Sequence, residues 1–207
     1  MVYNGRNSCS TCGGKHSTLN LTRQTGRQHF YEYTLKGDGE ETWHPRFSYY
    51  GFRYIQVEGA VLEGQPNPHQ LPVVKQLNSC FVYNSAEELS SFECSNELFT
   101  RTHRLIERAE RSNMQAVLTD CPHREKLGWL EQDHLCGPSL LYNYDMTAYI
   151  PKVIRDITDT QKTDGMVPTT APQYVSFGDL FDDSPEWGST LIILPFMYYD
   201  MYGDSTL

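Results

Sequence analysis

The hydrophobic pattern of this chain changes near residue 90, and that change limits the folds it can adopt. Before it, short β-prone runs alternate with glycines and prolines, which is typical of sheet proteins. After it, apolar residues recur at helical spacing, starting at Ser95. A strand-rich part followed by a helix-rich part predicts a multidomain β + α protein, with one domain over residues 1–90 and a second over 91–207.

In the first part, residues 1–27 are polar and rich in glycine and serine, which predicts a loop. Alternating aromatic and aliphatic residues in the run 41–59 indicate strands of a β-sandwich, and residues 59–72 read as a connecting segment. Aromatic residues in strands are more often packed than ligand-binding, so we expect a packing role for them. The predicted strands lie within 29–35, 41–59 and 73–85, the last including Phe81-Val82-Tyr83.

In the second part, Ser95 is predicted to cap a helix whose apolar residues share one face. A second helix is expected from about Gln132 to Tyr144. Pro151 predicts a kink in that helix or the start of a new one, because proline lacks the amide hydrogen that a helix interior needs. The expected inward residues are Leu98, Phe99, Leu105, Ile106 and Ala109 in the first helix, and Val153, Ile154 and Ile157 after the proline.

Gly165 is expected to end this helical region, and residues 166–183 to form a loop that exposes Tyr174 and Phe177. The last helix has clear signals, listed here in chain order: Ser184 as cap, Pro185 at the first position, Pro195 as a bend and Gly203 at the end. Its body, residues 187–202, is apolar on almost every side. Such a helix belongs inside a larger helical assembly.

The segment 119–133 concentrates charged and aromatic side chains between two predicted helices. It contains Asp120, Glu125, Glu131 and Asp133 together with one histidine, an arginine and Trp129, and a second histidine follows at position 134. Pro122, Leu127, Trp129, Leu130 and Leu135 are expected to anchor it. Carboxyl groups beside a flat apolar ring suit sugar chemistry, because hydroxyls need acceptors and a glycosidic oxygen needs a proton donor.

The sequence Asp-Cys-Pro-His-Arg-Glu-Lys-Leu-Gly-Trp at 120–129 closely resembles the catalytic segment of the bacterial α-L-rhamnosidases, the inverting glycoside hydrolases of family 78. Residues 41–59 resemble the end of the β-sandwich domain that precedes it. The resemblance implies an (α/α)6 barrel, built from roughly twelve helices in six hairpins. This chain contains only about four predicted helices, so we expect a fragment: a β-sandwich tail followed by an incomplete (α/α)6 barrel.

The resemblance also implies roles for particular residues. Glu125 stands where the family has its general acid, which protonates the leaving oxygen of the rhamnosyl group. Asp120 and Arg124 stand at positions that hold sugar hydroxyls, and Trp129 matches an aromatic residue that lines the pocket. The general base is expected beyond Leu207, so the chain alone is expected to be inactive.

The sequence departs from the commonest family form in two places. The spacing between Asp120 and the acid differs by one residue, and where the commonest form has an aspartate after Gly-Trp this sequence offers Glu131, Gln132 or Asp133. Glu131, Asp133 and Trp187 are therefore further candidates for substrate binding. Asp182, Asp183 and Glu186 are second-rank candidates, and Glu186 and Trp187 also suit structural roles at a helix start and in a core.

Composition excludes some partners. A net charge of -9 argues against nucleic acid, which requires a basic face. No apolar run approaches the roughly 20 residues of a membrane span, and residues 1–15 lack the hydrophobic core of a signal peptide. A rhamnose-containing glycan or glycoside is the expected partner. Periplasmic, secreted and cytoplasmic locations all stay open, as does the oligomeric state.

The six cysteines offer one local metal-ligand spacing, Cys9-x-x-Cys12 with His16 nearby. No second matching pair completes a tetrahedral site, so free thiols are favoured over zinc, and no cofactor is predicted. Cys121 has no activating partner in the sequence and is expected to pack rather than to act as a nucleophile.

Two classes of function fit these observations. The first is an inverting glycosidase that removes terminal α-L-rhamnose from plant glycosides or polysaccharides. The second is a non-catalytic glycan-binding module that uses the aromatic residues of the β-sandwich. The protonation of Glu125 separates them, because only a hydrolase requires a proton on that carboxyl group.

Overall fold

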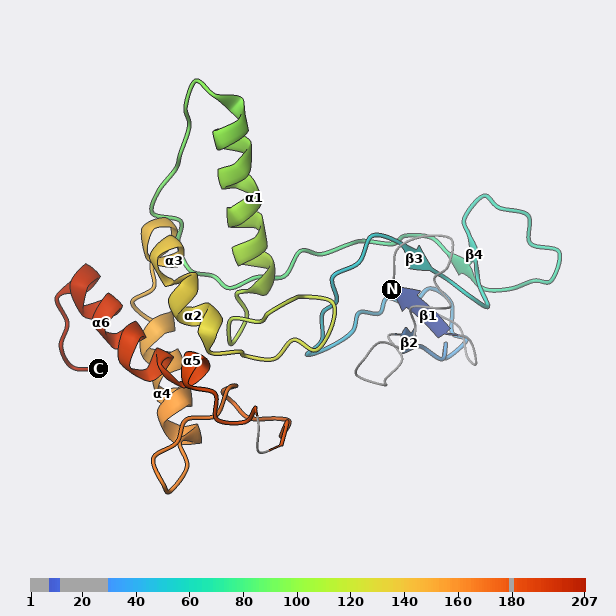
Figure 1. Ribbon diagram of the computed structural model, residues 1–207. Coiled ribbons are helices and arrows are strands. Elements are labelled where there is room, and N and C mark those ends of the chain that lie inside the picture. The colour runs from blue at the N-terminus through green and yellow to red at the C-terminus, as the bar shows by residue number, and fades with distance from the viewer. Residues whose placement is uncertain (1–7, 12–29, 179–180) are drawn as a thin grey trace. The chain divides into compact units, whose positions relative to one another are not determined.

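The computed structural model describes residues 8–11, 30–178 and 181–207 (Figure 1). These residues form two compact units, which are described separately. The first unit extends to Val82 and also includes Pro122–Glu125, whereas the second comprises Tyr83–Cys121 and Lys126–Leu207. Strands lie in the first unit and helices in the second, as the change of hydrophobic pattern predicts.

The first unit contains a small antiparallel sheet with the order β2-β1-β3. Its strands are β1 (Ser8–Thr11), β2 (Phe30–Glu32) and β3 (Ile55–Gln56). Cys9 is paired with Tyr31, and Thr11 is paired with Ile55. The prediction of a loop over residues 1–27 was therefore wrong for β1, because backbone pairing on both edges outweighs the weak strand preference of its serines.

A second pair of strands, β4 (Val61–Leu62) and β5 (Val73–Val74), is parallel. β4 lies inside the predicted connecting segment. The Val61 amide donates to the Pro72 carbonyl at 2.9 Å, and the Glu63 amide donates to the Val74 carbonyl at 3.0 Å. Phe81-Val82-Tyr83 was predicted as a strand but forms none, and its side chains are exposed. Strand preference alone does not decide whether a segment forms a strand, because it depends strongly on the surroundings of the chain.

Aromatic side chains of the first unit pack on one another. The ring of Tyr31 lies 5.7 Å from that of Trp43 and 5.5 Å from that of Tyr50, both edge to face. Tyr33 lies 5.4 Å from Trp43. These contacts agree with the predicted packing role, since edge-to-face pairs stabilise partly buried clusters.

Helix α1 (Glu97–Asn113) begins at Asn96, whose side chain accepts a hydrogen bond from the Leu98 amide at 3.0 Å. The predicted cap Ser95 was one residue too early, because Asn96 is the residue whose side chain reaches that amide. The predicted inward face was also wrong, since the side that carries Thr100 and Glu110 is buried instead. All five apolar residues named for that face, Leu98, Phe99, Leu105, Ile106 and Ala109, are exposed.

The second predicted helix is divided into α2 (Glu131–Leu135) and α3 (Gly137–Asn143). The break falls at Cys136, because Pro138 has no amide hydrogen to continue the ladder. Leu135, expected as an anchor, is 65% exposed, whereas Leu130 is 1% exposed. The predicted burial of the anchors Leu127 and Leu130 is confirmed, and the predicted burial of Leu135 was wrong.

A new helix, α4 (Tyr149–Thr160), begins just before Pro151, which confirms one of the two alternatives for that proline. Its residues Val153, Ile154 and Ile157 are buried, as predicted. The helix ends at Thr160, earlier than the expected stop at Gly165. The hydroxyls of Thr158 and Thr160 bond carbonyls of the preceding turn, and Gly165 instead occupies the following turn with φ +91°.

The last predicted helix also has two pieces, α5 (Pro185–Gly188) and α6 (Thr190–Tyr202). Gly203 ends α6 in the left-handed conformation, as its position predicts. One side of α6 meets the core through Leu194 and Tyr198, while Ile192 is 78% and Phe196 is 68% exposed. Helix α6 lies beside α2, α3 and α4 (Figure 1).

The core of the second unit is continuous from the end of α1 to α6. Met114, Tyr144, Met146 and Ile157 are almost completely buried in it. The Met146 amide donates to the Tyr202 hydroxyl at 3.2 Å, which fastens the end of α6 to the start of α4. Within residues 8–11, 30–178 and 181–207, no helix has the length and apolar character that crossing a membrane requires.

Candidate active site

The loop between α1 and α2 carries the predicted catalytic residues and is held where it turns. The Gly51 amide donates to the Pro122 carbonyl at 2.6 Å, inside the first unit. A Cβ atom at Gly51 would lie 3.0 Å from Pro122 Cγ and 3.2 Å from His123 Cβ. Glycine therefore allows the approach, and the turn before Glu125 is fixed by a residue far away in the sequence.

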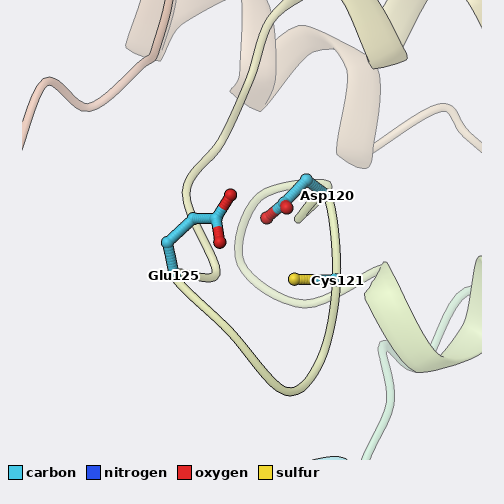
Figure 2. A group of neighbouring side chains, drawn as sticks. All are labelled: Asp120, Cys121 and Glu125. Atoms are coloured by element: carbon cyan, nitrogen blue, oxygen red, sulfur yellow. The ribbon is translucent and has the colours of Figure 1, made fainter. Parts of the chain in front are cut away.

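Asp120, Cys121 and Glu125 lie close together in this loop. The two carboxylates face one another across the loop, and the thiol points toward the same space (Figure 2). One ligand-type atom from each of the three side chains lies within 4.8 Å of the others. Cys121 is buried, in agreement with its predicted packing role, while Asp120 and Glu125 are partly accessible. A pair of accessible carboxylates is the minimum that acid-assisted glycosidic cleavage requires.

These three side chains are also the residues that could hold a metal ion in the part of the chain that the structure describes. Carboxylate pairs often lie together without an ion, and a closed zinc site needs a fourth ligand. The other candidate, Cys9 with Cys12 and His16, includes two residues that lie outside the described residues. Among the described residues, Cys80, Cys94 and Cys136 are free thiols.

Two basic residues flank Glu125. The Arg124 guanidinium lies 3.7 Å from the Glu125 carboxylate, and the Arg124 side chain is 49% exposed, so it is available to a ligand. Lys126 has a left-handed backbone with φ 56°. Burial lowers the pKa of Lys126 to about 8. Its cationic charge is therefore easily lost at mildly alkaline pH.

The chain leaves the loop through a short backbone ladder. The Ala171 amide donates to the Gly128 carbonyl at 3.0 Å, and the Leu130 amide donates to the Thr169 carbonyl at 3.0 Å. Trp129 and Thr170 form an antiparallel bridge between these bonds. Trp129 is thus fixed to a rigid backbone segment rather than to a free loop.

Replacement of Gly128 by alanine is expected to destabilise the second unit. A Cβ atom there would lie 2.6 Å from the Ala171 carbonyl oxygen and 3.1 Å from a Val117 methyl carbon. Overpacking of this kind typically costs about 1–3 kcal/mol. Thermal and urea unfolding would measure the loss. Gly188→Ala is the matched control, because its nearest contact is an ordinary 3.4 Å, and an equal loss in both variants would contradict the steric explanation.

Trp129 is the centre of an aromatic cluster that sequence reasoning found only in part. Its ring is stacked on Phe177 at 4.9 Å and lies 5.7 Å from Phe181 and 6.1 Å from Trp187. Trp129 and Trp187, both predicted for substrate binding, are therefore neighbours. Phe177 and Phe181 were missed as members of the site. The exposure of Phe177 was predicted and is confirmed at 40%, as is that of Tyr174 at 75%.

The residues after Trp129 have different environments. Glu131 is half-buried at the start of α2, and the Gln132 carboxamide donates to the Trp129 carbonyl at 3.4 Å. Asp133 is only 5% exposed. Burial raises the pKa of Asp133 to about 8, and the negative charge of Asp156 adds to the effect, while Lys152 opposes it. His134 is bonded to the Thr190 hydroxyl at 2.7 Å.

Asp133→Asn is expected to stabilise the second unit above neutral pH. The folded-state pKa of about 8 exceeds the ordinary value of 3.8, so stability is fully present below pH 3.8 and falls as the pH rises through 8. One pKa unit corresponds to about 1.4 kcal/mol, and relaxation around a buried charge reduces the total, so we expect a gain of about 1–3 kcal/mol at pH 8. Unfolding between pH 4 and 8.5 would show the difference growing with pH.

The exposed α4 residue Asp159 provides the control for this prediction. Asp159→Asn should leave the pH dependence of unfolding unchanged. A pH dependence that persists in Asp133→Asn, with the same slope as in the unsubstituted chain, would show that Asp133 is ionised in the folded protein at neutral pH.

One hollow of the first unit lies away from the predicted site. It has a volume of about 900 Å³ and is lined by residues between Leu35 and Cys80. It includes none of the predicted site residues, so the assignment of the site depends on the chemistry of the loop and on the aromatic cluster.

A loop with paired carboxylates at one end and an aromatic cluster at the other fits a sugar-cleaving enzyme, and comparisons with known proteins agree. Residues 87–207 match the bacterial alpha-L-rhamnosidase 6 hairpin glycosidase domain, which makes this part a six-hairpin glycosidase domain. Residues 13–83 match the bacterial alpha-L-rhamnosidase concanavalin-like domain. The chain belongs to the bacterial α-L-rhamnosidase family.

Relatives and solved structures support this membership. An α-L-rhamnosidase of Formosa agariphila is 34% identical over 88% of this chain, and one of Streptomyces avermitilis is 32% identical over 83%. The chain spans only 19% and 16% of these two relatives. Among solved structures, the α-L-rhamnosidase of Dictyoglumus thermophilum is 27% identical with a TM-score of 0.75, and the match covers 98% of this chain and 22% of that one.

The Streptomyces avermitilis α-L-rhamnosidase complexed with L-rhamnose is 27% identical with a TM-score of 0.70, over 98% of this chain and 19% of that one. Because each neighbour is several times longer than this chain, the similarity describes a portion of a larger enzyme. The sandwich-like and six-hairpin parts predicted from the sequence are confirmed at the level of the domain families.

Proposed function

We propose that the polypeptide to which this chain belongs hydrolyses terminal α-L-rhamnosides of plant glycosides or polysaccharides. The observation that carries the proposal is the facing pair of carboxylates, Asp120 and Glu125, in a loop that matches the family motif. Glycosidic cleavage requires a carboxylic acid to protonate the leaving oxygen and further groups to hold the sugar. The related structure that contains L-rhamnose supports this choice of sugar.

Each residue of the loop has a proposed role. Glu125 donates the proton to the departing oxygen, because it is partly accessible and follows the tightly held turn at Pro122. Asp120 accepts hydrogen bonds from sugar hydroxyls, and Arg124 donates them through its planar guanidinium. Trp129 and Trp187 offer apolar ring surfaces to the sugar, and Glu131 offers a further polar contact. Asp133 was predicted to share this role, but its side chain is only 5% exposed and is too buried to reach the sugar.

We further propose an inverting mechanism in an (α/α)6 barrel. Inversion requires a second carboxylate roughly 6.5–9.5 Å from the acid, positioned to activate water on the opposite face of the sugar. We assign no residue of this chain to that base, and inactivity of the 207-residue chain alone stays a prediction. The proposed division into residues 1–90 and 91–207 falls near the limits of the two family matches.

The test is a comparison of aryl glycosides in an enzyme that contains this chain within a complete domain. Hydrolysis of an aryl α-L-rhamnoside, with no comparable activity on an aryl α-L-arabinofuranoside or β-D-glucoside, is expected. Proton NMR during turnover should show β-L-rhamnose as the first product. Absence of activity on every α-L-rhamnoside would overturn the proposal, and an α-configured first product would overturn the inverting mechanism alone.

The alternative, a glycan-binding module that uses the aromatic residues of the first unit, has less support. Tyr31, Tyr33 and Trp43 are engaged with one another, so their rings are partly occupied by packing. Binding of L-rhamnose that survives replacement of Trp129 but not of Trp43 would favour this alternative.

A further inference from the structure

Beyond Trp129, the aromatic surface continues on a turn that contains residues 176–178 and 181–182. Phe177 is stacked on Trp129 with 27° between the ring planes, and Phe181 meets Trp129 edge to face at 64°. Phe177 is 40% and Phe181 is 38% exposed. The two phenylalanines therefore extend an apolar surface from Trp129 toward the solvent.

The Asp182 side chain holds this turn together through hydrogen bonds. Its carboxylate accepts a hydrogen bond from the Ser176 hydroxyl at 2.5 Å and another from the Phe177 amide. The amides of Phe181 and Asp182 both donate to the Gly178 carbonyl at 3.1 Å. Gly178 has φ +86°, a conformation that glycine adopts without strain. The Asp182 carboxylate thus fixes the backbone of Phe177, whose ring is stacked on Trp129.

The backbone of Asp182 is also tied to the segment that carries Trp129. The Thr169 amide donates to the Asp182 carbonyl at 2.8 Å, and the Thr169 carbonyl in turn accepts from the Leu130 amide at 3.0 Å. The neighbouring Asp183 instead pairs with Lys162 at 2.6 Å. The two adjacent aspartates therefore have separate structural tasks.

The stacking distance shows where a ligand would lie. At 4.9 Å between ring centroids, no sugar ring fits between Trp129 and Phe177. Phe177 is therefore not the opposite wall of a slot for rhamnose, and only its outer face is available. An aromatic face binds the apolar side of a sugar ring or an aryl group, so this surface suits a ring joined to the rhamnosyl group.

We propose that Asp182 is a positioning residue that holds Phe177 and Phe181 as the wall of a second subsite, which binds the ring-shaped group attached to rhamnose. This inference rests on the proposed rhamnosidase function. Asp182 itself does not contact the substrate, because its carboxylate is 9% exposed and its oxygens are used inside the turn. Hydrogen bonds from Ser176 and from the Phe177 amide also hold the pKa of Asp182 below its usual range, which suits a permanent acceptor rather than a proton donor.

The test uses three ligands with the complete enzyme: an aryl α-L-rhamnoside, a rhamnosyl-glucoside, and free L-rhamnose as a competitive inhibitor without an attached ring. Asp182→Ala and Phe177→Ala should each raise KM for at least one ring-bearing substrate by about tenfold, with kcat within about twofold. The inhibition constant of L-rhamnose should stay within about twofold. The aryl and sugar substrates show which ring the wall prefers. Asp159→Asn, at an exposed residue of α4, should change neither quantity.

A double variant tests whether Asp182 acts through Phe177. Asp182→Ala combined with Phe177→Ala should be no worse than Phe177→Ala alone, because residues that act through one another are not additive. Ser176→Ala, which removes one hydrogen bond, should show the same change more weakly, and it serves if Asp182→Ala fails to fold. The proposal would be overturned if the effects of the two substitutions on KM multiplied in the double variant. It would also be overturned if affinity for all three ligands fell equally.

A second measurement separates this proposal from the proposed function. In the 207-residue chain with Trp43→Phe, loss of the Asp182 carboxylate should increase acrylamide quenching of tryptophan fluorescence by about twofold, since Phe177 would no longer cover Trp129. Increased quenching in an enzyme without rhamnosidase activity would reject the function and keep the positioning role of Asp182. Unchanged quenching would reject the positioning role, whatever the activity.

Discussion

Glu125→Gln is expected to lower kcat on a rhamnoside with a poor leaving group by about 10²–10⁴-fold, the usual contribution of general acid catalysis. The amide has nearly the shape of the carboxylic acid but no transferable proton, so KM for the substrate should change little. On an activated aryl rhamnoside the loss should be much smaller, because that leaving group departs without protonation. Steady-state kinetics across a series of leaving groups would measure this dependence.

The matched control is Glu97→Gln, the same chemical change on an exposed residue in the first turn of α1. It should leave all kinetic constants unchanged. Wild-type turnover of the poor substrate by Glu125→Gln would remove Glu125 from the role of acid. An equal loss on good and poor leaving groups would do the same, since it would indicate damage to the site rather than loss of a proton.

Asp120→Asn is expected to lower kcat/KM by about 10–100-fold on every rhamnoside, whatever its leaving group. A hydrogen bond to a charged acceptor contributes about 1.5–3 kcal/mol, and this contact with a hydroxyl does not depend on the departing group. The logarithm of kcat/KM, plotted against leaving-group pKa, should shift down without a change of slope. The two carboxylates that face each other in Figure 2 would thus be separated by their kinetics.

Asp200→Asn, on the exposed side of α6, is the control for charge removal alone. If the loss in Asp120→Asn instead disappears as the leaving group improves, Asp120 is the proton donor. The roles of Asp120 and Glu125 would then have to be exchanged. This outcome is informative because both carboxylates lie in the same loop and face one another.

Local signals in the sequence predicted helix positions better than they predicted helix contacts. Gly203 ends α6 because a left-handed residue was needed there, and that need is visible in the sequence. The apolar face of α1 was equally visible, yet Leu98 and Leu105 are exposed while Glu110 is buried. Glu110 is within reach of the Asn143 amide at 3.5 Å, and the pKa of its carboxyl is raised by burial. Periodicity cannot reveal such a polar partner from another helix.

In the site, too, features that depend on consecutive residues were predicted, and contacts between distant segments were missed. The motif from Asp120 to Trp129 located the loop, because its members are consecutive. Phe177 and Phe181 were missed, since their contact with Trp129 depends on the pairing of residues 128–130 with 169–171. Close approach to the Ala171 carbonyl explains why position 128 is a glycine, and that glycine was the one local signal of the pairing.

The hydrogen bond from Gly51 to Pro122 bears on how this protein could be divided or recombined. Residues 122–125 follow the helical domain's first helix in the chain but have their contacts with the strand-bearing unit. A cut between the two family matches, near residue 85, would leave the turn before Glu125 without its support. Exchange of the strand-bearing part with that of a relative would have to supply a small residue and an amide donor at the place of Gly51, because otherwise the turn before Glu125 would lose this hydrogen bond.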